Sequence, residues 1–67
     1  MISLKTLIRD IKLSEPSQRA LAEAGINTLE DLTHWSTRDV LALHGVGPKT
    51  IRIVTPLLES LGLHFKP

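Results

Sequence analysis

Residues 43–54 of the protein read LHGVGPKTIRIV. Two glycines, Gly45 and Gly47, enclose the apolar Val46, and Pro48 then stands where a proline is accepted in the first turn of a helix. Glycines at this spacing permit a tight turn between two helices and a close approach of the backbone to another group. The pattern predicts a turn that Val46 anchors in the core, followed by a helix that begins at Pro48.

The start of that helix has the features of an anion site. Amides in a first helical turn have no intrahelical partner, and the helix dipole favours negative charge there. We expect the amides of Gly47, Lys49 and Thr50 to face outward, together with the Lys49 ammonium and the Thr50 hydroxyl. The plain alternative is a tight interhelical turn that happens to carry an exposed lysine. The convergence of these features in one place favours phosphate binding.

Apolar residues recur at helical spacing through the rest of the sequence, and no stretch alternates like a strand. Thr28 precedes Asp31 by three residues, and Ser36 precedes Asp39 by three residues. A serine or threonine at this distance before an acidic residue is typical of a helix start. Pro56 lies inside the last apolar pattern and predicts a kink or a break near Thr55. The expected helices cover residues 3–11, 16–24, about 28–35, 36–43 and 48–61.

The sequence nearly repeats itself, because Gly45-Val46 follows a helix as Gly25-Ile26 does twenty residues earlier. Each glycine stands where a left-handed helix cap is needed, and Gly62 is expected to end the last helix in the same way. We therefore expect an all-α fold, a compact bundle of about five short helices with two stacked hairpins. Its predicted core consists of Leu21, Leu32, Leu41, Val46, Ile51, Val54 and Leu58.

Composition sets limits on the class of protein. A sequence of 67 residues has room for one domain, residues 1–67, and its lack of cysteine excludes disulfides and thiolate metal sites. The N-terminal stretch is interrupted by charges too often for a signal peptide or a membrane span, so a cytoplasmic protein with no membrane partner is expected. The helical core described above is expected to fold as a monomer. The net charge of +1 does not by itself indicate a nucleic-acid binder.

Other chemistry is poorly supported. His34, His44 and His64 are spaced irregularly and no carboxylate cluster accompanies them, so we expect no metal, no cofactor and no catalytic residues. His44 adjoins the hairpin and is a candidate for a pH-dependent phosphate contact, although a capping or surface role is the simpler interpretation. Trp35 is more typical of packing than of base stacking.

The hairpin resembles the helix-hairpin-helix motif, which has leucine, any residue, glycine, apolar residue, glycine, any residue and then lysine or arginine. The span from about Ser14 to Leu63 is similar to the C-terminal domain of the bacterial RNA polymerase alpha subunit, and residues 1–13 would form a helical extension. The resemblance is carried by AGINTLEDL at residues 24–32, by GPKT at 47–50 and by SQR at 17–19. It implies that Arg19 enters the DNA minor groove and that Gly47, Lys49 and Thr50 grip the DNA backbone.

Two departures from the family pattern concern DNA contacts. Ala22 and Gly45 stand where the family usually has asparagines, which implies fewer polar contacts in the minor groove and a grip that depends less on base sequence. The resulting hypothesis is a non-catalytic, nucleoid-associated domain of bacterial transcription that binds duplex DNA. Additional positive charges for DNA binding would come from Lys12, Arg52 and Lys66. The expected site residues are Arg19, His44, Gly45, Gly47, Lys49, Thr50 and Arg52.

A second hypothesis stays open. The same fold could serve as a protein-interaction module that docks on RNA polymerase or on a transcription regulator through an acidic or apolar face, for example around Glu15, Glu30 and Asp31. The low net charge favours this alternative, whereas the hairpin glycines and Lys49 favour DNA.

Overall fold

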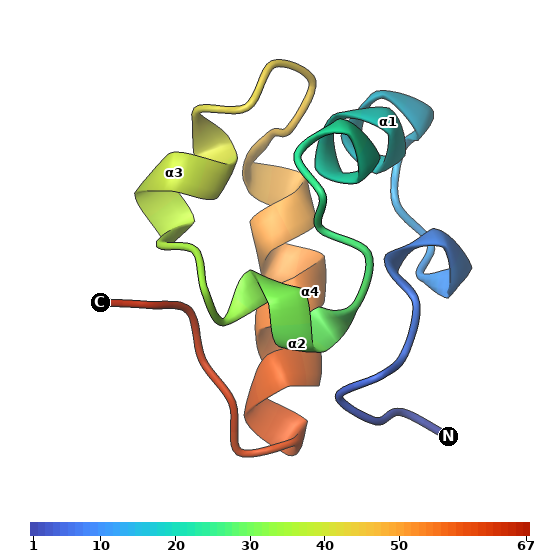
Figure 1. The fold of residues 1–67 in the computed structure, drawn as a ribbon, viewed down its shortest axis with the longest axis vertical. Coiled ribbons are helices and arrows are strands. Elements are labelled where there is room, and N and C mark those ends of the chain that lie inside the picture. The colour runs from blue at the N-terminus through green and yellow to red at the C-terminus, as the bar shows by residue number, and fades with distance from the viewer.

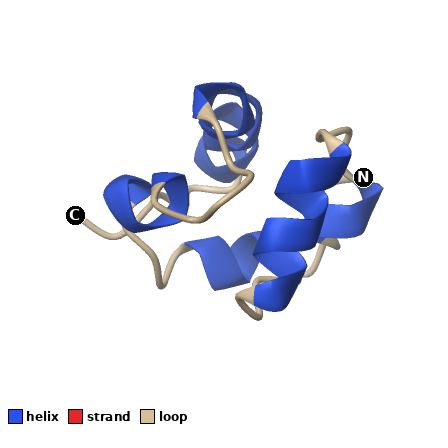
Figure 2. Cartoon of the chain, turned by 90° about the horizontal axis from the view of Figure 1, so that it is seen from above, coloured by secondary structure: helices blue, strands red, loops and turns tan.

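A computed structural model describes residues 1–67. The protein folds into four α-helices and a short 3-10 helix without a sheet, which confirms the expected all-α class (Figures 1 and 2). In the view of Figure 1 the longest helix, α4, lies at the back, and Figure 2 shows α1 and α3 on either side with α2 opposite α4, between them. The elements are η1 (Ile8–Asp10), α1 (Glu15–Glu23), α2 (Leu29–Leu32), α3 (Thr37–Leu41) and α4 (Pro48–Ser60).

Every helix contributes to a single core. Five of the predicted core residues are buried and Ile51 is half-buried against them, but Leu41 is 38% exposed, so its assignment to the core is wrong. On a helix as short as α3 only one face meets the core, and Val40 occupies it. The next residue is turned by about 100° and faces solvent. The buried apolar residues are Ile8, Ala20, Leu21, Ile26, Leu29, Leu32, Val40, Val46, Val54 and Leu58.

Side-chain caps define where three of the helices begin. Ser14 accepts a hydrogen bond from the amide of Ser17 and starts α1, while Ser36 starts α3 in the same way. Thr28 forms the expected capping box with Asp31 at the start of α2. The Asp31 carboxylate accepts the amides of Asn27 and Thr28 at 2.9 and 3.0 Å. These bonds hold the pKa of Asp31 below its usual value, and the bond from Asn27 has the largest effect. Partial burial of the carboxylate opposes the shift.

The repeat seen in the sequence is present in the backbone. Gly25 and Gly45 have φ of +80° and +101°, and each is followed by a buried apolar residue, Ile26 and Val46. Positive φ at these positions lets each turn reverse the backbone direction without the steric conflict of a Cβ. The hairpin turns α1–α2 and α3–α4 therefore each pass through a glycine with positive φ and then bury the next residue.

The predicted helix over residues 3–11 is wrong. Only η1 forms there. Residues 3–6 form a turn, in which the Thr6 amide donates to the Ser3 carbonyl at 3.0 Å, and Leu7 lies in an antiparallel bridge to Thr28. The carbonyls of Thr6 and Leu4 accept the amides of Leu29 and Glu30 at 3.1 and 3.0 Å. A short isolated helix is marginal in water, and here the segment before η1 gains hydrogen-bond partners that the first turn of α2 supplies. The apolar pattern is still used, because Ile8 is buried.

The other differences concern helix length. The break allowed for near Thr55 is wrong, because α4 continues through Pro56 to Ser60. Proline removes the donor for the Arg52 carbonyl, and because both residues are exposed, water can bond to that carbonyl instead. α2 ends at Leu32 and leaves Trp35 outside it, half-buried against the core, where its carbonyl accepts the amide of Lys66 at 2.9 Å.

A buried hydroxyl cluster joins the second hairpin to α1. The Ser17 hydroxyl lies 2.7 Å from the Thr50 hydroxyl and donates to the carbonyl of Gly45 at 3.1 Å. With that proton committed, Thr50 is the donor to Ser17, and the Ser14 hydroxyl donates to the same oxygen at 3.1 Å. Both Ser17 and Thr50 are buried, so this cluster replaces water for groups that otherwise would be unsatisfied.

We predict that Ser17→Ala lowers the free energy of unfolding by about 1–3 kcal/mol, because it leaves the buried Thr50 hydroxyl and the Gly45 carbonyl without this partner. Ser60→Ala is the matched control, since that exposed hydroxyl bonds only to the Leu57 carbonyl and its loss should cost less than about 0.5 kcal/mol. Urea unfolding followed by circular dichroism measures both. Equal effects would show that the cluster does not stabilise the fold.

We predict that Asp31→Asn destabilises the protein near neutral pH by about 0.5–2 kcal/mol, the usual range for a helix cap. The folded-state pKa of Asp31 lies below its ordinary value of 3.8, so the charged carboxylate stabilises the fold above that pH. The contribution is lost as the pH falls through the folded pKa. Unfolding curves over a pH series should show the gap between wild type and variant closing at acid pH, and a gap that is constant with pH would contradict this account.

Candidate nucleic-acid interface

Gly45 fixes the second hairpin on α1. A Cβ at this position would lie 2.8 Å from the carbonyl oxygen of Pro16, and the φ of +101° already disfavours any other residue. The first turn of α1 and the α3–α4 turn are therefore in contact through backbone atoms. This glycine is required for the fold, whatever the hairpin binds.

Gly47 is different. Its φ of −119° and ψ of 176° are extended values that any residue adopts, and a Cβ built there would have no neighbour within 4 Å. The folded protein therefore does not require glycine here. The open space beside its backbone is accessible to a group from outside the molecule.

The first turn of α4 lacks the side-chain cap that begins each of the other three α-helices. Gly47 is its N-cap residue and has no side chain to accept a hydrogen bond. The amides of Gly45, Gly47 and Lys49 donate no hydrogen bond within the protein, since none occurs among its backbone or side-chain bonds. These donors therefore remain available to water or to an external acceptor.

The first hairpin shows how the fold satisfies such amides when no ligand is involved. There Asn27 and Thr28 donate to the Asp31 carboxylate, and Leu29 and Glu30 donate to carbonyls of the N-terminal segment. An internal anion thus occupies the start of α2. The amides of Gly47 and Lys49 at the start of α4 are likewise outside the helix's own hydrogen bonds, but no internal acceptor meets them.

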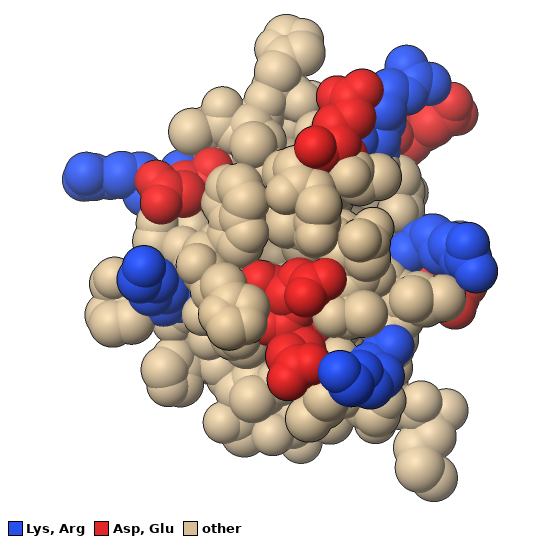
Figure 3. Space-filling view, in the orientation of Figure 1, with Lys and Arg blue, Asp and Glu red and all other residues tan.

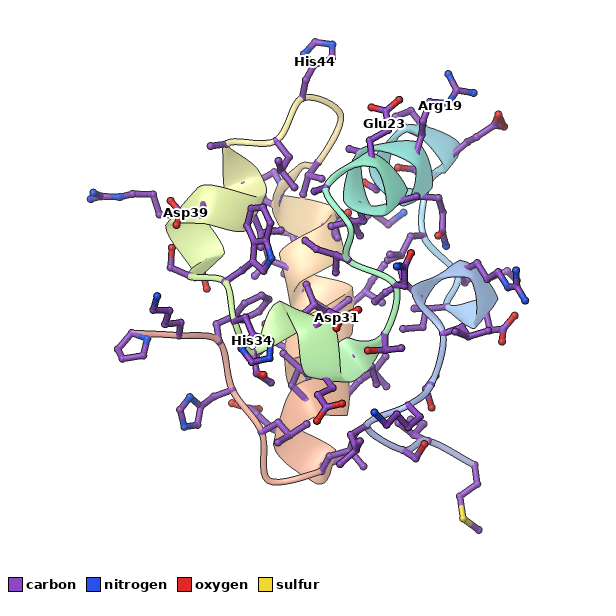
Figure 4. All side chains as sticks on the ribbon, in the orientation of Figure 1. Arg19, Glu23, Asp31, His34, Asp39 and His44 are labelled. Carbon is purple, nitrogen blue, oxygen red and sulfur yellow. The ribbon has the colours of Figure 1, made fainter.

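The structure brings several of the predicted site residues to this end of the molecule. His44 projects from the apex of the hairpin, and Arg19 points outward from the neighbouring α1 (Figure 4). Lys49 and Arg52 are exposed on α4 and, three residues apart, lie on one side of that helix. Arg19 is held at 3.3 Å by Glu15 in a solvent-exposed ion pair. Such pairs contribute little and exchange readily with water or another anion.

Thr50 does not face outward as expected from the sequence. Its side chain is 4% exposed and bonded to Ser17, and its amide donates to the Gly47 carbonyl at 3.1 Å. The residue holds the hairpin in place instead of presenting a hydroxyl to a ligand. The partner that sequence analysis missed is Ser17, and its burial could not be deduced from spacing because the two hydroxyls come from different helices.

The face shown in Figure 3 has no single large patch of one charge. Blue and red side chains alternate around it, and several basic side chains lie directly beside acidic ones. In the Lys5–Glu30 ion pair, at 2.9 Å, the hydrogen bond and the charge of Glu30 raise the pKa of Lys5. With a net charge of only +1, attraction for an anion depends on local arrangement.

Two further observations concern other functions. The structure contains no group of three His, Cys, Asp or Glu side chains that could hold a metal ion. None of its helices combines the length and the hydropathy that a membrane crossing requires.

Comparison with known proteins places the protein in a family. Residues 1–60 match the family model for the C-terminal domain of the alpha subunit of bacterial RNA polymerase. The match starts at residue 1, so it includes the segment over residues 1–13 that was expected to be an extension. That segment is not an α-helix, and its Leu4 and Thr6 carbonyls pair with the start of α2.

Similar full-length proteins are named DNA-directed RNA polymerase subunit alpha. The protein from Alkaliphilus metalliredigens is 38% identical over 64 residues, which are 96% of the present sequence and 20% of that relative. Those from Desulfitobacterium hafniense and Clostridium acetobutylicum are each 36% identical over 63 residues, which are 94% of the present sequence and 20% of the relative. The present sequence therefore spans about a fifth of the length of these relatives. From the match over residues 1–60, it belongs to the family of C-terminal domains of the bacterial RNA polymerase alpha subunit.

Proposed function

We propose that this domain binds duplex DNA through the phosphate backbone, as a non-catalytic part of bacterial transcription. A DNA phosphate accepts hydrogen bonds from the free amides of the α3–α4 hairpin, at the start of α4, while the Lys49 ammonium supplies a full positive charge. His44, Arg52 and, after exchange of its Glu15 partner, Arg19 contact the flanking backbone. The names of the relatives, DNA-directed RNA polymerase subunits, agree with this proposal.

The observation that carries the proposal is that the two hairpins differ in whether the amides at the following helix start have hydrogen-bond acceptors within the protein. At the start of α2 the backbone amides donate hydrogen bonds to Asp31 and to carbonyls of the N-terminal segment. At the start of α4 the amides have no partner within the protein, and they lie beside Gly47, where the backbone does not require a glycine. A protein that needed only a tight turn could place a capping side chain at Gly47, since the space is free. The open start is consistent with a ligand that takes the place of the cap.

The second candidate function, a protein-interaction module that docks on RNA polymerase or a regulator, has weaker support. Of its proposed acidic contacts, Glu15 and Glu30 form only exposed ion pairs, which exchange readily and do not oppose docking, but Asp31 is engaged within the domain. Asp31 accepts two backbone amides and caps α2. A partner would have to displace these interactions, whereas phosphate meets unpaired donors at the hairpin.

We predict that binding to a short duplex is weak, largely indifferent to sequence and steeply dependent on salt, because counterion release drives it. For about three to five phosphate contacts, the logarithm of the association constant should fall against the logarithm of the salt concentration with a slope of roughly −3 to −4.5. Fluorescence anisotropy of labelled duplexes at several salt concentrations measures it. Binding that does not respond to salt would favour the protein-interaction alternative.

We predict that Gly47→Val weakens duplex binding by about tenfold, the equivalent of about 1.4 kcal/mol, while the protein stays folded. The substitution leaves every charge in place but puts a branched side chain where the backbone and a phosphate must approach each other. Gly47→Ala should have a smaller effect in the same direction. Thermal unfolding by circular dichroism is the control, and a folded Gly47→Val protein that binds DNA as wild type does would exclude the hairpin as the contact surface.

A further inference from the structure

The hairpin has two flanks, and they differ in charge. On one flank a depression of about 270 Å³ brings together Lys12, from the segment before α1, and Lys49, from the first turn of α4. Its other lining residues are Leu13, Ser14, Thr50 and Ile53, so no carboxylate borders it. Neither lysine forms an ion pair with an acidic residue of the domain.

On the other flank the cations are opposed by acids. A depression of about 500 Å³ is bordered by Arg19, His44 and Gly45, but also by Glu15 and Glu23. Figure 4 shows Glu23 and Arg19 side by side on the outer face of α1. A phosphate that approaches this flank meets two carboxylates and an arginine already paired at 3.3 Å.

The backbone beside Lys12 is held in place although the lysine itself is exposed. The Gln18 side chain donates to the carbonyls of Ile8 and Ile11 at 3.0 and 2.7 Å, and the amide of Leu13 donates to the Ile11 carbonyl at 2.8 Å. The bonds from Gln18 tie this segment to α1, and the Ser17–Thr50 bond ties α1 to the start of α4. The two lysines are therefore carried by segments that are fixed relative to each other.

We propose that Lys12 is a phosphate-contacting residue, and that the DNA strand which contacts the hairpin runs over the Lys12–Lys49 flank. The inference rests on the proposed function and deepens it, because it assigns the side of the hairpin on which the backbone lies. One phosphate occupies the open start of α4 beside Lys49, and Lys12 contacts the same or the neighbouring phosphate. Because both groups are lysines acting on phosphate, this contact carries no information about base sequence.

The test compares lysine variants of the full 67-residue protein in titrations with a short duplex over a range of salt concentrations. Lys12→Ala should weaken binding and flatten the salt slope by about one unit, as Lys49→Ala does. Lys66→Ala is the matched control. The sequence suggested Lys66 as an auxiliary charge, but the structure pairs its backbone with Trp35 and Ser36, at the end of α3 away from the hairpin, so removing this exposed charge should leave the slope unchanged. Lys12→Arg should retain the wild-type slope.

The outcomes separate the two proposals. If Lys49→Ala flattens the slope while Lys12→Ala behaves as Lys66→Ala, the assignment of Lys12 is overturned and the proposed function stands. The flank is also wrong if Arg19→Ala weakens binding more than Lys12→Ala does. If wild-type protein shows no salt-dependent binding to the duplex, both proposals fail together.

Discussion

The close contact between Gly45 and the first turn of α1 is the constraint on which the rest of the structure depends. The Pro16 carbonyl oxygen lies 2.8 Å from where a Cβ of Gly45 would be, and the Gly45 carbonyl in turn accepts a hydrogen bond from the Ser17 hydroxyl. Through Ser17 the same contact reaches Thr50, so a buried network of hydrogen bonds joins α1, the turn and α4. This network holds the start of α4 in place beside the hairpin.

The two helix starts that follow the hairpin glycines differ in how their amides are satisfied. In the first hairpin Asp31 satisfies the free amides from within, which stabilises the fold and leaves nothing for a ligand. In the second hairpin the corresponding donors are unpaired, and unpaired amides at a helix start favour an anion through hydrogen bonds and the helix dipole. The proposed DNA contact therefore depends on the absence of a capping side chain at Gly47 and on the lysines near it.

Net charge is a poor guide to such a site. The protein has a net charge of only +1, and the face seen in Figure 3 mixes acids with bases. Two lysines from separate segments nevertheless border one depression free of carboxylates. At physiological ionic strength charges are screened beyond about 8 Å, so a phosphate at the hairpin responds mainly to this local group and not to the total.

The sequence by itself determined the helical class, the starts of α1 to α4, the left-handed glycines and the position of the hairpin, because these follow from local spacing and capping. Predictions from it were wrong for residues 3–11, for the break near Thr55, for Leu41 and for the Thr50 hydroxyl, and two of these errors have a tertiary cause. Residues 3–7 do not form a helix because α2 offers them partners, and Thr50 turns inward because Ser17 meets it from another helix. Which amides remain free, and which lysines lie together, was decided only by the tertiary structure, since both depend on contacts between residues distant in the sequence.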